Sequence, residues 1–308
     1  MNHKYDYIIY HKNCLDGFFS VVILKYLNII SSNCFIFADV PSNINKIPIN
    51  IENKKVIIVD VAYHVNMIKK ICNIAKEVLY IDHHITHEKD IISLNFKNLI
   101  KVINTQTFSA CYLTWKYFSK EKVPQIVKYI SDNDTGTWKY KYTNMIITTL
   151  NVEYKIDINK INDWITLFDK NNLKKLIKKG KQYMNYTEYL LEKTISQHTI
   201  VTFPTRQLFK KYPKIANREN QYKVAIHNGA CPTTTLVGNY LLKNVECDFV
   251  VVYSYNLEKH KYTISFRSKK INVESIAKIL GGGGHKYAAS CQINSSEFHL
   301  EDLFEVIQ

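Results

Sequence analysis

Acidic and imidazole side chains recur in this chain at the ends of segments that the sequence predicts to be strands or helices. Four such positions carry them: His11 with Asp16, then Asp60, then Asp82, His83 and His84, and finally Asp132 with Asp134. Two divalent cations about 3.5–4 Å apart need a shared carboxylate and further imidazole or carboxylate ligands, and they lower the pKa of a bound water until it becomes a nucleophile. Mixed nitrogen and oxygen ligands suit Mn²⁺ better than metals that seek thiolates. The pattern therefore predicts a two-metal hydrolytic site.

Each of these residues also has a purely structural explanation. Asp60 could cap a helix that begins near His64, and His11 could be a hydrogen-bonded histidine of the core. Asp132 or Asp134 could end the helix predicted before them. Because four separate coincidences at strand or helix ends would be needed, one shared metal site explains the pattern better.

The first half of the chain alternates strand and helix patterns. Continuous apolar runs predict four strands, at Asp6–Tyr10, Cys34–Val40, Val56–Val61 and Val78–Ile81. Helices are predicted between them, at Leu15–Leu27 and His64–Ala75. Strands that are continuously apolar and separated by helices indicate a parallel sheet covered on both faces. Polar residues at the carboxyl ends of such strands lie where open α/β sheets bind ligands.

The second half begins with a charged helical stretch and ends in another compact unit. Ile156–Gln197 is predicted to be a connecting helix pair, and its lysine cluster at 174–181 is interpreted as a solvated face rather than a nucleic-acid patch. Strands and helices then alternate again, at Tyr222–His227, Thr233–Leu242, Phe249–Tyr255, Tyr262–Phe266 and Val273–Leu280. We therefore expect two α/β domains, at 1–155 and 205–308, joined by a helical linker at 156–204.

Composition narrows the class of protein. The 308 residues are 46% hydrophobic and 22% charged, which excludes disordered and fibrous proteins. A net charge of +14 favours polyanionic partners such as nucleic acid, nucleotides or an anionic membrane surface, although a Lys-, Ile- and Asn-rich chain is also what AT-rich coding produces. No apolar run is long enough to span a membrane, no signal peptide is recognisable, and the seven cysteines form no C-x-x-C pair. We expect a cytoplasmic protein with no membrane partner and leave its oligomeric state open.

Five ordered segments resemble a known family. Four of them resemble motifs one to four of the DHH phosphoesterases: HKNCLDG (His11–Gly17), VIIVD (Val56–Asp60), YIDHH (Tyr80–His84) and YISDNDTG (Tyr129–Gly136). The fifth, Ser265–Ser290, resembles the Arg-Ser and Gly-Gly-Gly-His signature of the DHH-associated domain. The resemblance implies a parallel-sheet catalytic domain, a helical linker and a smaller α/β substrate-binding domain, with the active site between the two domains.

The resemblance also implies roles for the residues of the first three motifs. His11 would bind the first metal, and Asp16 and His83 the second. Asp60 would bridge both metals. His84 would face the scissile phosphate, while Asp82 would orient its neighbours.

Two positions leave alternatives open. In the fourth motif, Asp132 follows the apolar-Ser pattern of the family's ligand, whereas Asp134 begins the Asp-Thr-Gly of the nanoRNase branch; we favour Asp132. In the first motif, many members carry a second carboxylate where Lys12–Leu15 stands here, although one branch has a cysteine. The first metal would then be held by His11 and Asp60 with water or with Cys14, and Cys14 could equally be an inert buried residue.

The glycine run Gly281–Gly284 and the residues near it are candidates for substrate binding. Backbone N–H groups of glycines can approach a phosphate closely, and an imidazole or guanidinium can donate to its oxygens. This gives the set Arg267, Ser268, Gly282, Gly283, Gly284 and His285. Arg267 is one of three arginines in the chain, so its place in a motif is informative. The alternative is that the glycines only end a helix.

The resemblance implies a phosphodiesterase that uses two Mn²⁺ ions, with Mg²⁺ possible. Its substrates would be short single-stranded RNA or DNA oligonucleotides or cyclic dinucleotides, degraded to mononucleotides. Two other functions stay open. An inorganic pyrophosphatase or polyphosphatase would use the same metal cluster. A catalytically weakened nucleic-acid or nucleotide binder would account for the missing carboxylate and the +14 charge.

Overall fold

The computed structural model describes residues 4–43, 46–84, 88–104, 107–212, 215, 221–229 and 231–307. The chain forms two compact units, Met1–Met184 and Asn185–Gln308. The boundary between them falls within a single helix, α8 (Lys170–Ile195). The finer division into 1–155, 156–204 and 205–308 stays a prediction.

The first unit is built on a five-stranded sheet in the order β2-β1-β3-β4-β5, in which every pair is parallel. The strands are β1 (Tyr5–His11), β2 (Ile30–Asp39), β3 (Lys55–Val59), β4 (Glu77–Asp82) and β5 (Leu99–Ile103). The helices before α8 are α1 (Leu15–Tyr26), α2 (Val65–Ile74), α3 (Glu88–Ser93), α4 (Ala110–Phe118), α5 (Gln125–Asp134), α6 (Thr143–Glu153) and α7 (Ile161–Ile165). The predicted parallel α/β sheet is confirmed.

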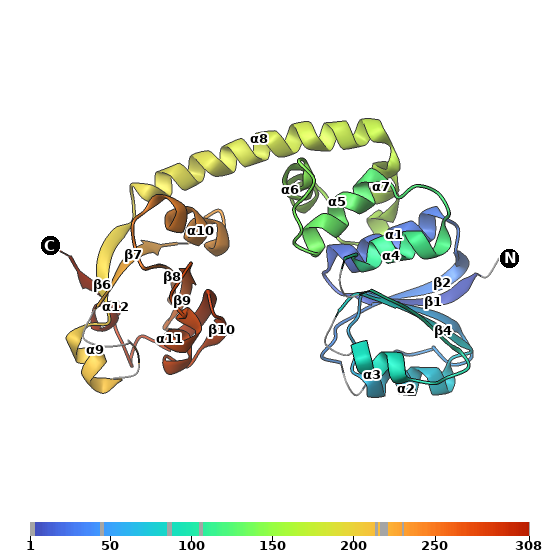
Figure 1. The fold of residues 1–308 in the computed structure, drawn as a ribbon, viewed down its shortest axis with the longest axis horizontal. Helices are drawn as coiled ribbons and strands as arrows, with labels where there is room; N and C mark the ends of the chain where they lie inside the picture. Colours follow the sequence, from blue (N-terminus) through green and yellow to red (C-terminus); the bar gives the residue numbers. More distant parts are fainter. Residues whose placement is uncertain are drawn as a thin grey trace. The chain divides into compact units, whose positions relative to one another are not determined.

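Helices cover both faces of this sheet, which explains why its strands are continuously apolar. Alternate residues of each strand enter different cores: Ile8 and Ile57 pack on one face, Ile9 and Ile58 on the other. Figure 1 shows α1 and α4 on one side of the sheet and α2 and α3 on the other. Since all strands run the same way, their carboxyl ends meet at one edge, where the motif residues are placed.

The predicted connecting helix pair at Ile156–Gln197 is wrong. The first part of this segment forms only short helical turns, namely the 3-10 helices η1 (Ile158–Lys160) and η2 (Thr166–Phe168) and the five-residue α-helix α7. Trp164 and Leu167 on these turns are fully buried in the core of the first unit. One 26-residue helix, α8, follows them. The apolar residues tie the first part of the segment to the sheet domain and leave a single helix as the connection.

The second unit has a seven-stranded mixed sheet in the order β10-β11-β9-β8-β7-β6-β12. Only β7 and β8 pair in parallel among its described strands. The strands are β6 (Thr199–Phe203), β7 (Tyr222–Asn228), β8 (Phe249–Asn256), β9 (Lys261–Ser268), β10 (Gly283–His285), β11 (Ala288–Asn294) and β12 (Glu305–Val306). The helices are α9 (Arg206–Lys211), α10 (Thr234–Asn244), α11 (Val273–Ile279) and α12 (Leu300–Leu303). The expected second α/β domain is therefore confirmed.

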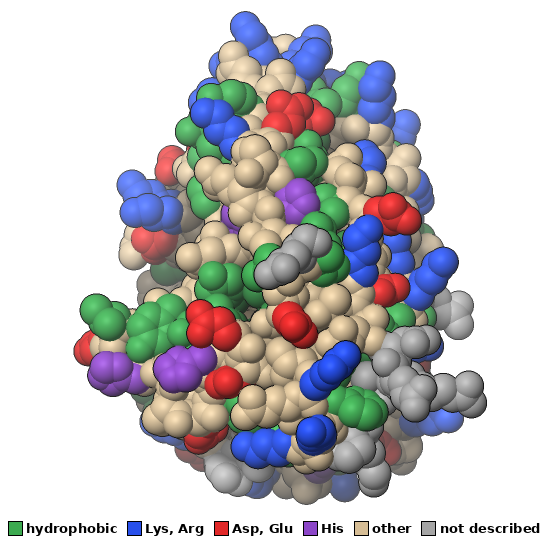
Figure 2. Space-filling model, turned by 90° about the vertical axis from the view of Figure 1, so that its left-hand side faces the viewer, with side chains coloured by type: hydrophobic (Ala, Val, Ile, Leu, Met, Phe, Trp, Pro, Cys, Tyr) green, Lys and Arg blue, Asp and Glu red, His purple; other side chains and the backbone are tan. Residues whose placement is uncertain are grey.

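Within the described ranges, no helix is both long enough and apolar enough to cross a membrane. All seven cysteines lie in these ranges and all are free thiols. On the face shown in Figure 2, Lys and Arg side chains alternate with Asp and Glu, so the basic charge does not gather there into one patch.

Candidate metal centre

The carboxylate of Asp60 lies at the centre of a cluster of metal-ligating side chains. Asp60 follows β3, is 1% exposed and has a φ of 63°, a left-handed conformation that is uncommon outside glycine. Its N–H donates to the carbonyl of Ile81 at 3.0 Å, so β4 holds this turn in place. A Cβ on Gly17 would lie 3.0 Å from Asp60 Oδ2, so the motif-one glycine leaves the carboxylate its space. Asp60 does not cap α2, because His64 is the N-cap of that helix.

Imidazole nitrogens and other carboxylates converge on Asp60. Nδ1 of His11 lies 3.6 Å from Asp60 Oδ2, and Nε2 of His83 lies 3.3 Å from Oδ1. The same His83 nitrogen is 3.1 Å from Asp134 Oδ2 and 3.8 Å from Asp16 Oδ2. These approaches lack hydrogen-bond geometry: both Asp60 oxygens, His11 Nδ1 and Asp134 Oδ2 are buried with no hydrogen-bond partner among the described residues. Buried polar atoms left unpaired in this way fit a divalent cation.

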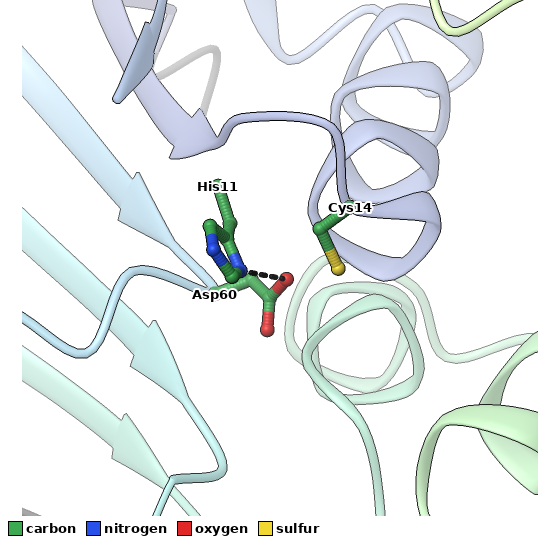
Figure 3. Close-up of side chains that lie close together, drawn as sticks. All are labelled: His11, Cys14 and Asp60. Carbon is green, nitrogen blue, oxygen red and sulfur yellow. Dashed lines mark ion pairs between the residues drawn. The ribbon is translucent and has the colours of Figure 1, made fainter. Parts of the chain in front are cut away.

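The donor atoms fall into three trios, each with its ligand atoms within 4.8 Å of one another. They are His11 with Cys14 and Asp60, Asp60 with His83 and His84, and Asp16 with His83 and Asp134. Figure 3 shows the first trio, with His11 at the end of β1, Asp60 after β3 and Cys14 at the start of α1. Because Asp60 belongs to two of the trios, it has the position of a bridging ligand.

The cluster concentrates negative charge away from water. Burial and the charges of Asp60 and Asp134 raise the pKa of Asp16 to about 7. Burial disfavours the imidazolium of His83, but the adjacent carboxylates outweigh it and raise the pKa of His83 to about 9. Burial also opposes ionisation of Asp60, yet the two neighbouring imidazoles and the Cys14 thiol hold its pKa below the usual range. The site therefore favours positive charge at its centre, which bound cations would supply.

Asp16 is held by the amino end of α4, a contact that sequence analysis missed. Asp16 Oδ1 accepts from Ser109 Oγ at 2.6 Å and from the N–H of Cys111 at 3.0 Å, and Oδ2 accepts from the N–H of Ala110 at 2.7 Å. A helix amino end offers unpaired N–H groups and favours a carboxylate. A serine directly before an apolar helical run, as Ser109 is before α4, is a recognisable N-cap signal for a helix. The separation of 93 residues between Ser109 and Asp16 conceals the contact in the sequence.

The two acidic residues of the fourth motif have different surroundings. Asp134 brings its carboxylate to the cluster, beside His83. Asp132 instead accepts hydrogen bonds from the hydroxyls of Thr137 and Thr143 at 2.7 and 2.5 Å. Two backbone N–H groups, at 139 and 140, complete its partners at 2.8 and 3.1 Å. The geometry thus favours Asp134 as a ligand, against the preference for Asp132 drawn from the sequence.

Asp82 lies behind the cluster and orients His84. Asp82 Oδ1 is 2.7 Å from His84 Nδ1 and accepts the N–H of His83 at 2.9 Å. Its Oδ2 accepts the hydroxyl of Tyr80 at 2.6 Å. The bond to Asp82 raises the pKa of His84 despite burial, so the imidazole carries positive charge more readily. A cationic imidazole at this edge can neutralise a phosphoryl oxygen.

Arg267 and His285 lie on one face of the second sheet. Arg267 on β9 and His285 on β10 are both register partners of Ala288 on β11. The side chains of these three residues therefore lie in one row across the sheet. The guanidinium of Arg267 donates to the carbonyl of Phe266 at 2.9 Å and to Thr235 Oγ1 at 3.1 Å. Thr235, near the start of α10, was not among the candidates from the sequence.

The glycine run and Ser268 are largely used by the fold itself. The N–H groups of Gly281 and Gly282 donate to the last turn of α11 at 3.1 and 2.7 Å. Gly283 and Gly284 belong to β10, and a Cβ on Gly284 would lie 2.6 Å from a carbonyl of β11. The hydroxyl of Ser268 accepts two backbone N–H groups, at 270 and 271, that close the turn after β9. The run is a helix end followed by a strand, and phosphate binding by these groups stays a prediction.

Comparison with known proteins identifies the second unit and one relative. Residues 224–308 match the model of the DHHA1 domain. The uncharacterized protein R106 of Acanthamoeba polyphaga mimivirus is 27% identical over 299 residues, which cover 92% of this chain and 66% of that protein. The chain thus spans about two thirds of the length of this relative.

The fold is also similar to that of a solved structure. A pGpG-specific phosphodiesterase, PggH from Vibrio cholerae, has a TM-score of 0.55 at 14% identity, covering 96% of this chain and 95% of that one. RecJ of Thermus thermophilus, in a structure with Mn²⁺, has a TM-score of 0.40 at 12% identity, covering 95% of this chain and 50% of RecJ, a likeness too weak to carry an argument. The DHHA1 match confirms the resemblance of the second unit to the DHH-associated domain, and the shared fold agrees with the expected arrangement of the first unit. The nanoRNase branch stays a prediction.

Proposed function

We propose that this chain, a DHH-family protein with a carboxyl-terminal DHHA1 domain, is a Mn²⁺-dependent phosphodiesterase that degrades short oligonucleotides or cyclic dinucleotides to mononucleotides. The observation that carries the proposal is the Asp60 cluster, in which both Asp60 oxygens, His11 Nδ1 and Asp134 Oδ2 are buried without hydrogen-bond partners in the described chain. The name of the Vibrio cholerae protein, which gives pGpG as its substrate, supports a substrate of dinucleotide size.

The residues of the cluster are assigned to two cation positions. Bound Mn²⁺, with Mg²⁺ as a possible substitute, supplies an activated water and neutralises charge on the phosphate. We assign Asp60 to both cation positions, and Asp16, His83 and Asp134 to one of them. His11 and Asp60 belong to the other position. Asp134 takes the place for which the sequence favoured Asp132.

His84 acts on the substrate rather than on a cation in this proposal. Its Nδ1 faces Asp82 at 2.7 Å, which fixes the orientation of the ring and favours the imidazolium. The imidazolium would then neutralise charge on a phosphoryl oxygen. Tyr80 holds Asp82 from the other side, so the orientation does not depend on substrate.

The DHHA1 domain would hold a second phosphate of the substrate. Arg267 is the best candidate because a planar guanidinium recognises phosphate through two hydrogen bonds, and His285 shares its row on the sheet. Thr235 positions the guanidinium at 3.1 Å.

The test is a substrate panel with the purified full chain. After chelation and readdition of Mn²⁺, labelled linear dinucleotides, cyclic dinucleotides, longer single strands and pyrophosphate are compared, and the products are separated by chromatography. We expect Mn²⁺-dependent release of mononucleotides from the shortest substrates. Asp60→Asn should lower this rate at least roughly several hundredfold, because one carboxylate serves both cation positions.

Other results would favour the alternatives. Preferential release of phosphate from pyrophosphate would identify a pyrophosphatase. Binding of nucleotides without turnover by any divalent cation would identify a binding protein. Near-normal turnover by folded Asp60→Asn would refute the shared-carboxylate arrangement itself.

A further inference from the structure

Two of the three donor trios in the Asp60 cluster differ in chemistry. The trio of Asp16, His83 and Asp134 offers two carboxylates and an imidazole. The trio of His11, Cys14 and Asp60 offers one nitrogen, one oxygen and one sulfur (Figure 3). A soft sulfur donor changes which cation binds best, so the two positions need not take the same ion.

The backbone turns Cys14 toward the cluster instead of toward its own helix. Asn13, before it, is left-handed with a φ of 58°, and the N–H of Cys14 donates back to the carbonyl of His11 at 3.4 Å. Cys14 is the N-cap of α1, yet its side chain makes no capping hydrogen bond. Serine, threonine, aspartate or asparagine would perform that role. The residue at this position is therefore not explained by helix capping.

Core packing does not explain Cys14 either. The two hydrophobic cores of the first unit, as formed by its described residues, include Cys34, Cys72 and Cys111 but not Cys14. Cys14 is only partly buried. Its sulfur instead lies near Asp60, whose side chain is 1% exposed and whose two oxygens are unpaired within the described chain. The alternative of an inert core cysteine thus lacks support.

We propose that His11, Cys14 and Asp60 form a thiolate-containing site that selects Zn²⁺ over Mn²⁺, so that the centre holds Zn²⁺ beside Mn²⁺ when both ions are offered. Three protein ligands with one open position are the usual arrangement of catalytic zinc, and sulfur and nitrogen are its preferred donors. Binding replaces the thiol proton, which passes to solvent, by a metal–sulfur bond with no oxidation. This inference rests on the proposed function insofar as the Asp60 cluster must bind divalent cations.

Cobalt provides the direct test, because Co²⁺ bound to a thiolate shows charge-transfer absorption in the near ultraviolet. Chelator-treated full-length protein is titrated with Co²⁺, and then with Zn²⁺ or Mn²⁺ as competitor. We expect the absorption in the wild type and its loss in Cys14→Ser, with binding of a second ion retained. Cys34→Ser is the matched control, since Cys34 is also partly buried but packs in the core, and should keep the absorption. Zn²⁺ should remove the absorption at concentrations where Mn²⁺ does not.

Alkylation of the wild type gives a second measurement that does not depend on how the variants fold. Iodoacetamide labelling is mapped by mass spectrometry with and without each metal. Zn²⁺ should protect Cys14 while leaving the exposed Cys231 reactive, and Mn²⁺ should protect neither.

A third measurement exchanges the sulfur donor for oxygen. Cys14→Asp should lower the affinity of this position for Zn²⁺ by at least about tenfold and raise its affinity for Mn²⁺.

The outcomes separate this inference from the proposed function. If Co²⁺ binds without charge-transfer absorption and Zn²⁺ does not protect Cys14, the thiolate site is refuted while the metal centre stands. If no divalent cation binds to the wild type at all, the proposed function fails as well. Equal Zn²⁺ affinity in the wild type and Cys14→Asp would also overturn the selectivity.

Discussion

Exchanging each acidic residue of the fourth motif for asparagine should give two opposite phenotypes. Asp132 and Asp134 both lie on α5 and are two residues apart, but only Asp134 reaches the cluster. Asp132→Asn should cost folding stability and leave metal binding intact. Asp134→Asn should cost metal binding and leave stability intact.

The magnitudes follow from the partners of each carboxylate. Asp132 accepts four hydrogen bonds, two on each oxygen. In Asp132→Asn, one carboxylate oxygen is replaced by an NH₂ group, which cannot accept hydrogen bonds. Whichever oxygen is replaced, the NH₂ group then faces a backbone N–H donor that has lost its acceptor. Hydrogen bonds to a charged group contribute about 1.5–3 kcal/mol each, so we expect a loss of roughly 2–4 kcal/mol in the free energy of unfolding. Asp134 Oδ2 has no hydrogen-bond partner in the described chain, so its replacement should change stability by less than about 1 kcal/mol.

Two assays on the same proteins decide the prediction. Urea unfolding in the presence of a chelator measures the stability of the metal-free chain, and calorimetric titration with Mn²⁺ measures affinity. Asp134→Asn should weaken Mn²⁺ by at least about ten- to a hundredfold. Full Mn²⁺ affinity in Asp134→Asn, or a large loss in folded Asp132→Asn, would refute the assignment and restore the preference drawn from the sequence.

Three further predictions concern positions outside the cation ligands. Ser109→Ala removes the 2.6 Å bond to Asp16 and should weaken Mn²⁺ roughly tenfold in calorimetry, while Ser109→Thr should restore it. Arg267→Ala should leave Mn²⁺ binding unchanged and lower kcat/KM for a dinucleotide by roughly ten- to a hundredfold, the equivalent of ~1.5–3 kcal/mol. Burial lowers the pKa of His227, so the unfolded chain takes up the proton first on acidification. Neutral His227 therefore makes its full contribution to the free energy of unfolding above the ordinary histidine pKa of about 6.5, and this contribution declines as the pH falls below that value. In urea unfolding, His227→Gln should make this decline less steep.

Each of these has an outcome that would contradict it. Unchanged Mn²⁺ affinity in Ser109→Ala would mean that the backbone donors of α4 suffice to hold Asp16. Loss of Mn²⁺ binding in Arg267→Ala would contradict the assignment of metal binding to the first unit and of phosphate binding to the second. An equally steep acid decline in His227→Gln would assign the pH dependence to other groups.

The sequence alone determined the class of fold and which segments carry the chemistry. Continuous apolar runs can be buried on both faces only in a covered parallel sheet, and the carboxyl ends of parallel strands necessarily meet at one edge. His11, Asp60 and Asp82 follow such runs directly, so their convergence was predictable from local pattern. Periodicity did not reveal β10, because two glycines followed by one histidine carry no strand signal.

The tertiary structure decided which atom of each motif faces the cluster. Residues two apart on a helix point about 200° away from each other, so the choice between Asp132 and Asp134 depends on how α5 packs, which no local pattern encodes. The support of Asp16 by Ser109 spans 93 residues and exists only once α4 lies beside α1. The direction of Cys14 depends on the left-handed turn at Asn13. Sequence pattern fixes the strand that delivers a side chain, whereas packing fixes the direction in which the side chain points.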